Sequence, residues 1–254
     1  MDKWSMTFDL HTHTRLVRKG REITHAVSTM EEVVLSAREK GLEKIGISNH
    51  GPGHVLYGLP QESVALLKEE RDRLQRLYPD IEILVGVEAN IIDIDGGLDV
   101  RPEDFKEFDY ILAGYHYGIF GKRPVDAALL HSKNWLWEKT GFPKGGLMEN
   151  NTQRLVQAIL KNKPLAVTHP GDKSPVDIEE VARACETTGT WMEINNFHKD
   201  LTVENLKKVA KYDVKFVIGS DAHKPERVGC FQEGLERLLK SGVDPERVVN
   251  LKRK

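Results

Sequence analysis

The side chains best suited to chemistry in this sequence are its histidines, seven of which follow a short apolar run or lie in the loop beside one. The seven are His11, His13, His25, His50, His116, His169 and His223. Glu88 and Asp221 stand in the same kind of position. Neutral imidazole nitrogen and carboxylate oxygen are good ligands for zinc, iron and manganese. The pattern therefore predicts a centre that holds more than one metal ion.

Two pairs of these residues are two positions apart, His11 with His13 and Asp221 with His223. Because the side chains of a strand alternate between its faces, residues two apart project to the same side and can bind one ion. A single His-x-His pair is a weak signal. The joint occurrence of both pairs with the other donors favours a metal centre over incidental histidines.

The elements that must position these residues can be read from the alternation of apolar runs with amphipathic stretches. Strands are expected over residues 6–10, 44–48, 81–88, 110–116, 165–169, 190–195 and 215–220, and helices over 29–40, over 61–78 and between the later strands. Strands that alternate with helices predict parallel pairing with right-handed crossovers. About seven such units predict an α/β fold, a closed or nearly closed barrel in one domain over residues 1–254. The active sites of such barrels lie at the C-terminal ends of the strands, where the metal-binding residues fall.

The overall composition excludes several classes of protein. The 37 Lys and Arg nearly balance the 39 Asp and Glu, so no overall field attracts nucleic acid or an anionic membrane. No apolar stretch approaches the length of a membrane span or a secretory signal, and a cytoplasmic protein is expected. Cys185 and Cys230 are far apart in the sequence, which argues against a disulfide framework and against a cysteine metal site.

Five short motifs together resemble those of a known family. They are Asp-Leu-His-Thr-His-Thr at 9–14, Gly-Val-Glu-Ala-Asn at 86–90, Thr-His-Pro-Gly at 168–171, Glu-Ile-Asn-Asn at 193–196 and Gly-Ser-Asp-Ala-His at 219–223. In this order they resemble the PHP family, named for polymerase and histidinol phosphatase domains, and above all its small bacterial phosphatases with three metals. The resemblance covers almost the whole chain. It implies a distorted (β/α)7 TIM-like barrel with the metal site at the C-terminal ends of the strands.

The resemblance also implies a ligand set of nine residues for two to three divalent ions, zinc, manganese or iron. The first metal would be held by His11, His13, Glu88 and Asp221, the second by Glu88, His116 and His169, and the third by His25, His50 and His223. One departure is Asn49, where the family usually places Asp before the ligand histidine. Since a carboxylate orients an imidazole more strongly than an amide does, the third position is expected to bind its metal more weakly.

The function that follows is hydrolysis of a small phosphomonoester by a metal-activated water held near Glu88 and Asp221. His50 or His223 would relay a proton if the third position is empty. No Cys-x5-Arg loop, Walker A sequence or Gly-x-Ser-x-Gly elbow supports a covalent or nucleotide-driven mechanism. The alternatives are a histidinol-phosphate phosphatase, a 3′ to 5′ nuclease and a non-catalytic metal-binding scaffold. Dispersed basic residues disfavour nucleic acid as a partner, and the oligomeric state stays open.

Three arginines are candidates for binding the substrate. Arg15 and Arg21 belong to a basic stretch flanked by two proposed ligands, which is either a solvated loop or a phosphate clamp, and the clamp is slightly favoured. Arg227 follows the last ligands and would either bind substrate or cap the next helix. The segment 117–149 is either a lid that brings Trp135 or Trp137 over the site or a short helix packed by its tryptophans. The remaining histidines, His54, His131 and His198, are given no role, and His54 is expected at the surface.

Overall fold

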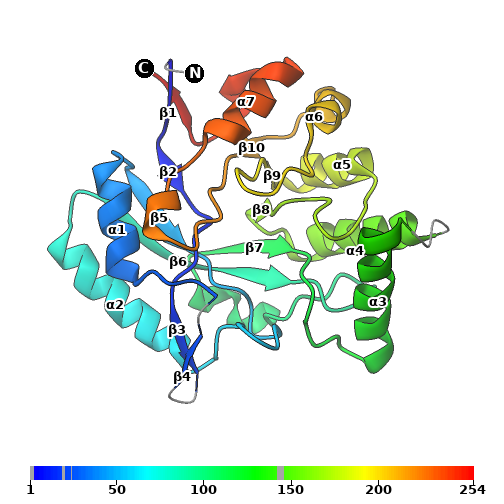
Figure 1. Cartoon of the computed structure of the whole chain (residues 1–254), viewed down its shortest axis with the longest axis horizontal. Helices are drawn as coiled ribbons and strands as arrows, with labels where there is room; N and C mark the ends of the chain where they lie inside the picture. Colours follow the sequence, from blue (N-terminus) through cyan, green and yellow to red (C-terminus); the bar gives the residue numbers. More distant parts are fainter. Residues whose placement is uncertain (1–2, 19–20, 24, 142–145) are drawn as a thin grey trace.

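The computed structural model describes residues 3–18, 21–23, 25–141 and 146–254, and a sheet of seven parallel strands lies at its centre. The strands are β2 (Phe8–Asp9), β5 (Lys44–Ile47), β6 (Glu82–Asn90), β7 (Tyr110–Gly114), β8 (Ala166–Val167), β9 (Trp191–Glu193) and β10 (Phe216–Val217). They lie side by side in chain order, and every neighbouring pair is parallel. The sheet curls on itself, as Figure 1 shows. The predicted TIM-like barrel of seven parallel strands is thus confirmed.

The two edge strands, β10 and β2, are joined by the C-terminal residues of the chain. Phe216 forms a parallel bridge with Val248, and the Asn250 side-chain amide donates to the carbonyls of Phe8 and Ile218, each at 2.8 Å. Beyond Asn250, β11 (Leu251–Arg253) pairs antiparallel with β1 (Trp4–Met6), so the two ends of the chain lie together (Figure 1). The strand predicted over residues 6–10 is therefore two short strands in different sheets.

Helices surround the sheet. They are α1 (Met30–Glu39), α2 (Ser63–Leu77), α3 (Pro124–Thr140), α4 (Leu147–Asn162), α5 (Ile178–Thr188), α6 (Val203–Val209) and α7 (Gln232–Ser241), with short 3-10 turns at η1 (Pro102–Glu107), η2 (Pro225–Arg227) and η3 (Pro245–Arg247). Three of those described, α1, α5 and α6, begin at a capping side chain. Thr29 and Glu32 form a capping box that begins α1. Leu74 of α2 is fully buried, whereas Leu77 is exposed. Among the described residues no helix combines the length and apolar character that crossing a bilayer requires.

Tyr110 is the largest of the buried side chains in one small apolar cluster of the barrel. Tyr110 packs with Leu10 and Leu112, and its hydroxyl donates to the Leu10 carbonyl at 2.8 Å. A Cβ at Gly46 or Gly86 would collide with the ring of this tyrosine, so the two neighbouring strands need glycine there. The packed Tyr110 ring therefore supports the strands that carry the predicted ligands.

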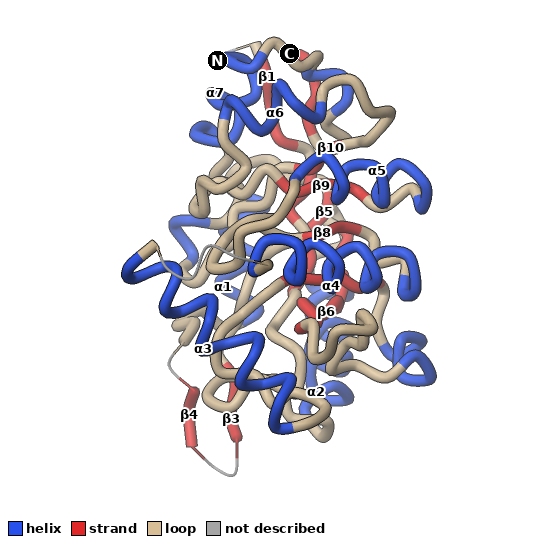
Figure 2. The backbone as a smooth tube through the Cα atoms, turned by 90° about the vertical axis from the view of Figure 1, so that its right-hand side faces the viewer, coloured by secondary structure: helices blue, strands red, loops and turns tan. Residues whose placement is uncertain are grey.

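Two features of the fold were not expected from the sequence. Residues 16–23 contain an antiparallel hairpin of β3 (Leu16–Arg18) and β4 (Arg21–Ile23), which projects from the barrel in Figure 2. In addition, residues 53–55 pair with residues 118–120, because the Val55 NH donates to the Gly118 carbonyl at 2.8 Å and the Phe120 NH to the Gly53 carbonyl at 2.9 Å. Both features lie at the end of the barrel where the strands point.

Candidate metal centre

The nine predicted ligands meet at the C-terminal ends of the strands. His11 and His13 follow β2, His50 follows β5, Glu88 lies in β6, His116 and His169 follow β7 and β8, Asp221 and His223 follow β10, and His25 follows the hairpin strand β4. Seven of the nine are buried; His223 is partly exposed and His25 is exposed. The sheet order explains this gathering, since parallel strands aim their ends at one mouth. Their role as ligands remains a prediction.

Glu88 lies at the centre of the group and is fully buried. Five imidazoles approach its carboxylate: His169 at 2.9 Å, His50 at 3.1 Å, His11 and His116 at 3.3 Å, and His13 at 3.7 Å. His169, His11 and His116 face Oε1. His50 and His13 face Oε2. A carboxylate surrounded in this way can bridge two adjacent ions.

Asp221 serves a second group of donors on the other side of His11 and His13. Its Oδ1 lies 3.3 Å from His13 Nε2 and 3.6 Å from His11 Nε2. Its backbone is left-handed, with a φ of 52°, a conformation that costs a non-glycine residue free energy and clusters at functional sites. His169, with a φ of 28°, is a second predicted ligand in this conformation.

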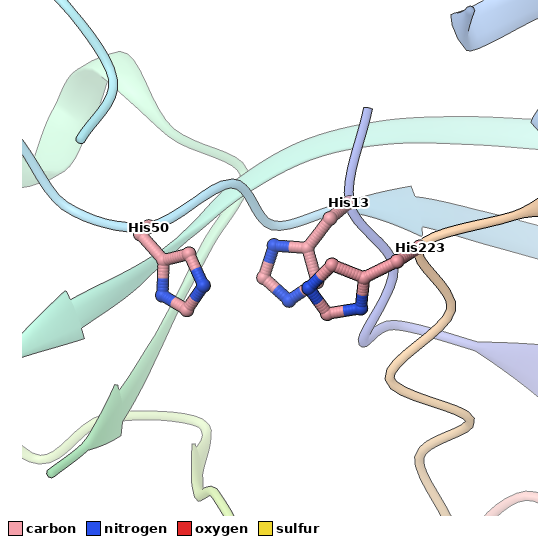
Figure 3. Close-up of side chains that lie close together, drawn as sticks. All are labelled: His13, His50 and His223. Carbon is pink, nitrogen blue, oxygen red and sulfur yellow. The ribbon is translucent and has the colours of Figure 1, made fainter. Parts of the chain in front are cut away.

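A third group lies nearer the mouth, where His13, His50 and His223 turn their rings toward one another (Figure 3). The His13 ring stacks on each of the other two at a centroid distance of 4.5 Å. His25 adds a fourth imidazole, with its Nε2 at 3.3 Å from His50 Nε2 and 2.7 Å from His223 Nε2. The fourth ring thus comes from the hairpin rather than from the barrel.

The donor geometry fits divalent metal ions. Two ligand atoms that bind one zinc ion at about 2.1 Å with tetrahedral angles lie roughly 3.4 Å apart. The separations of 3.3 Å and 3.6 Å from Asp221 to its two histidines match that spacing. In addition, His11 Nε2, His13 Nε2, His50 Nδ1 and Glu88 Oε2 are buried without a hydrogen-bond partner among the described residues. Buried polar atoms normally have partners, so this cluster of exceptions indicates a ligand.

The protonation states of most of these donors agree with that interpretation. At His11 and His169, burial opposes the charged form, but neighbouring carboxylates outweigh it and raise the pKa of both imidazoles. Burial, together with neighbouring imidazoles, lowers the pKa of His13 and of His50 to about 3. Burial likewise lowers the pKa of His116 to about 4, despite the nearby Glu88. Burial opposes the ionisation of Glu88, but His116 and His11 outweigh it and hold the pKa of this carboxyl well below its usual value. Neutral imidazoles and ionised carboxylates are the forms that bind metal.

Comparison with known proteins identifies the family. The family described as "PHP domain" matches this chain over residues 9–220. The chain belongs to the PHP domain family. A relative from Acetivibrio thermocellus named "Probable phosphatase" is 33% identical over 96% of this chain and 92% of its own.

Two solved structures share the PHP fold. One is a putative histidinol phosphatase from Listeria monocytogenes, with a TM-score of 0.60 and 15% identity over 87% of this chain and 97% of that one. The other is the histidinol phosphate phosphatase of Lactococcus lactis, solved with zinc, L-histidinol and phosphate, with a TM-score of 0.57 and 13% identity over 94% and 95%. At these identities the likeness is one of fold.

The imidazoles of this PHP centre are held by residues for which no role was predicted. Glu193 Oε1 lies 2.6 Å from His11 Nδ1, and Glu193 Oε2 accepts a hydrogen bond from the backbone NH of His169 at 2.7 Å. Asn90 Oδ1 lies 2.7 Å from His116 Nδ1. Such partners fix the orientation of a ligand ring and raise its basicity. The sequence did hold a signal, because Glu193 and Asn195 are two apart at the end of a strand, just like His11 and His13.

The side chain of Asn49, the departure from the PHP pattern, forms no hydrogen bond with an imidazole among the described residues. Its side-chain oxygen accepts the Thr14 backbone NH at 2.8 Å, and its amide donates to the Thr14 hydroxyl at 2.9 Å. The residue therefore fixes the segment that carries His13 instead of orienting a ring. The expected contact behind a weaker third position is thus absent from the described residues.

A pocket of about 480 Å³ opens above the centre, and it includes residues that sequence reasoning missed. Besides predicted ligands and Arg227, it is lined by Tyr57, Lys173, Phe197, His198 and Lys224. His198, to which no role was assigned from the sequence, lies beside a predicted ligand: its Nε2 lies 3.4 Å from Asp221 Oδ2 and its Nδ1 lies 3.3 Å from Asp172. His54, expected at the surface, is only 2% exposed and stacks on Tyr57 at 3.5 Å. A short polar loop gave no signal of this burial.

The three predicted substrate arginines occupy different places. Arg227 lines the pocket. Arg15 is exposed and pairs with Glu22 across the hairpin at 3.4 Å, outside the described pocket lining. The side chain of Arg21 lies outside the described part of the structure. The substrate role of all three stays a prediction.

The segment predicted as a lid is mostly helical and stands beside the site. Trp135 of α3 is 54% exposed and lines an outer apolar groove with Tyr117 and Leu136, and neither Trp135 nor Trp137 is in the described lining of the metal pocket. The Tyr117 hydroxyl donates to the Lys173 carbonyl at 3.1 Å, which ties the start of this segment to the pocket wall. Lid movement therefore stays a prediction.

Proposed function

We propose that this PHP protein hydrolyses a small phosphomonoester, with water attacking phosphorus while the bond from phosphorus to the ester oxygen breaks. The observation that carries the proposal is the fully buried Glu88, faced by five imidazoles on the floor of an open pocket. Membership of the family, the relative named as a phosphatase and the donor set together make the chain a metal-dependent phosphatase.

The nine donors would hold two to three divalent ions in the groups given above. When bound, zinc, manganese or iron lowers the pKa of water, holds phosphoryl oxygens and neutralises the leaving oxygen. A structural zinc site is usually closed by four protein ligands, whereas this centre opens into a pocket that admits a substrate. The openness supports catalysis over a scaffold role.

Lys173 is our candidate for binding the phosphoryl group. It lines the pocket in a left-handed conformation with a φ of 55°, and its ammonium group lies 3.0 Å from Asp172. Burial disfavours its charge, but Asp172 raises the pKa of this lysine above its usual value, so it stays a cation. A fixed ammonium group can donate to phosphoryl oxygens throughout the reaction.

Histidinol phosphate is the second candidate substrate. The observation that favours it is the fold shared with the Lactococcus lactis enzyme, whose structure contains zinc, L-histidinol and phosphate. A sequence identity of 13% shows that the two proteins share a fold but does not identify the substrate of this chain.

The test couples metal analysis to activity. Protein purified without an affinity tag would be analysed for metals by mass spectrometry and assayed for phosphate release from a panel of phosphomonoesters, before and after chelation. We expect two to three metals per chain and release that stops on chelation and returns with manganese, iron or zinc. The Glu88→Gln variant, purified in parallel, controls for contaminating phosphatases. Fewer than two metals with no rescue would overturn the proposal in favour of a scaffold.

A further inference from the structure

The pocket wall outside the metal centre is basic. Its described lining contains three cations, Lys173, Lys224 and Arg227. The carboxylates in that lining are Glu88 and Asp221, both of which are predicted ligands. A cleft lined by charges of one sign concentrates ligands of the opposite sign.

Two of these cations lack the acidic partner that the third has. Lys173 pairs with Asp172 at 3.0 Å, whereas neither Lys224 nor Arg227 forms an ion pair with any described residue. The neighbouring Lys199 shows that acidic residues are within reach of this region, since it pairs with Glu233 at 2.7 Å. Lys224 and Arg227 are thus exposed cations without an ion pair among the described residues, although the charge of Glu233 acts on Arg227 from farther away.

Phe197 holds one of the two charges in place. The Arg227 guanidinium lies 5.5 Å from the centre of the Phe197 ring, a ring that is 56% exposed and also lines the pocket. A cation over an aromatic face is attracted to it but keeps its hydrogen-bond donors available. Arginine uses such donors to bind carboxylate or phosphate through two parallel bonds.

We propose that the substrate is a phosphomonoester whose leaving group carries a second anionic group, a carboxylate or another phosphate, and that Lys224 and Arg227 bind it. This inference rests on the proposed function and narrows its substrate class. The pocket of about 480 Å³ lies within the usual range for small-molecule sites and has room for more than one phosphate. A leaving group that carries an ammonium or imidazolium group, such as histidinol, meets like charges at this mouth.

The test compares substrates that differ by one charge. Glycerol 3-phosphate and 3-phosphoglycerate differ by a hydroxymethyl group against a carboxylate, and fructose 6-phosphate and fructose 1,6-bisphosphate differ by one phosphate. The wild-type protein should show a kcat/KM about 10-fold or more higher for the more anionic member of one pair or both. The pair that shows the gain identifies the second group as carboxylate or phosphate. Histidinol phosphate should be the poorest of the five.

Variants then assign the effect to the two residues. The double variant Lys224→Met with Arg227→Met should bring the ratio of kcat/KM within the favoured pair close to one, with metal content unchanged. Lys199→Met removes one nearby exposed charge outside the pocket lining and should keep the wild-type ratio.

The outcomes separate the inference from the proposed function. Equal kcat/KM within both pairs in the wild-type protein would overturn the inference and leave a phosphomonoesterase. A ratio that survives the double variant would show that other residues bind the second group. No phosphate release from any of the five substrates would remove the proposed function itself. The wild-type comparison decides the substrate class without any variant having to fold.

Discussion

The deep and outer parts of the centre are built differently. In the deep part, His11, His116 and His169 are almost fully buried, and the first two rings are bound by side chains of sheet strands, Glu193 and Asn90. In the outer part, His25 is exposed and comes from a hairpin. Its ring is held by parallel stacking on Tyr57, at a centroid distance of 3.7 Å and an angle of 5°. Hydrogen bonds from a rigid sheet fix both the direction in which an imidazole points and its protonation state, whereas stacking fixes only the plane of the ring.

This difference predicts unequal metal affinity. The deep donors are held in the packed barrel, so little conformational entropy is lost when they bind an ion. Binding of an ion in the outer part must order the exposed side chain of His25, which follows a projecting hairpin (Figure 2). We therefore expect the deep positions to retain their ions when the outer position loses its own.

The largest effect is expected from Glu88→Gln. An amide cannot supply the negative charge that five imidazoles and the ions share, so kcat/KM should fall by about 10³-fold or more and metal content to below two per chain. Steady-state kinetics and metal analysis measure both. Glu82→Gln, an exposed change in the same strand, is the control. Full metal content in Glu88→Gln would contradict a bridging carboxylate.

The next effect is expected from Glu193→Gln. The variant keeps the size of the side chain but weakens its bond to His11, which should lower the metal affinity of the deep part by about 10- to 100-fold. Competition with a chromogenic chelator measures that affinity. If the affinity for the outer ion falls as much as that for the deep ions, the deep and outer parts are coupled and do not bind metal independently.

Lys173→Met tests the role of Lys173 in binding phosphate and changes no predicted metal ligand. Removal of one charge-assisted hydrogen bond to phosphate should raise the KM, and the inhibition constant of inorganic phosphate, by about 10-fold. Metal content should stay the same. Lys163→Met is a matched control, because Lys163 is also a lysine with a left-handed backbone, at the end of α4. Equal effects in the two variants would point to backbone strain rather than to phosphate binding.

The smallest effect is expected at Tyr57. Tyr57→Leu removes the stacking surface under His25 and should weaken only the outer ion, by about three- to tenfold, since aromatic pairs contribute roughly 0.5–1.5 kcal/mol. Tyr57→Phe keeps the ring and should bind that ion like the wild-type protein. Calorimetric titration of the outer ion into protein with loaded deep positions distinguishes them. Identical loss in both variants would assign the effect to the hydroxyl.

The sequence predicted the barrel and the donors because their signals are local. An apolar run that ends in His-x-His reports both a strand and the place where it ends. The partners of those donors carry no such local signal: Glu193 contacts His11 across 182 positions, and only the closed sheet brings them together. The burial of His54 and the place of His198 depend on how loops pack above the strands, which periodicity does not encode.

The seam between β2 and β10 also bears on how the centre is made. Asp9 Oδ1 accepts the backbone NH of Ser220, 211 positions later, at 3.3 Å, and these two residues flank the first and last donors. Closing so long a loop costs entropy that only the completed sheet can offset. A chain still emerging from the ribosome therefore carries His11 and His13 long before Asp221 exists to meet them. The full set of donors can assemble only after nearly the entire chain has been made, and until then His11 and His13 can bind metal ions without their later partners.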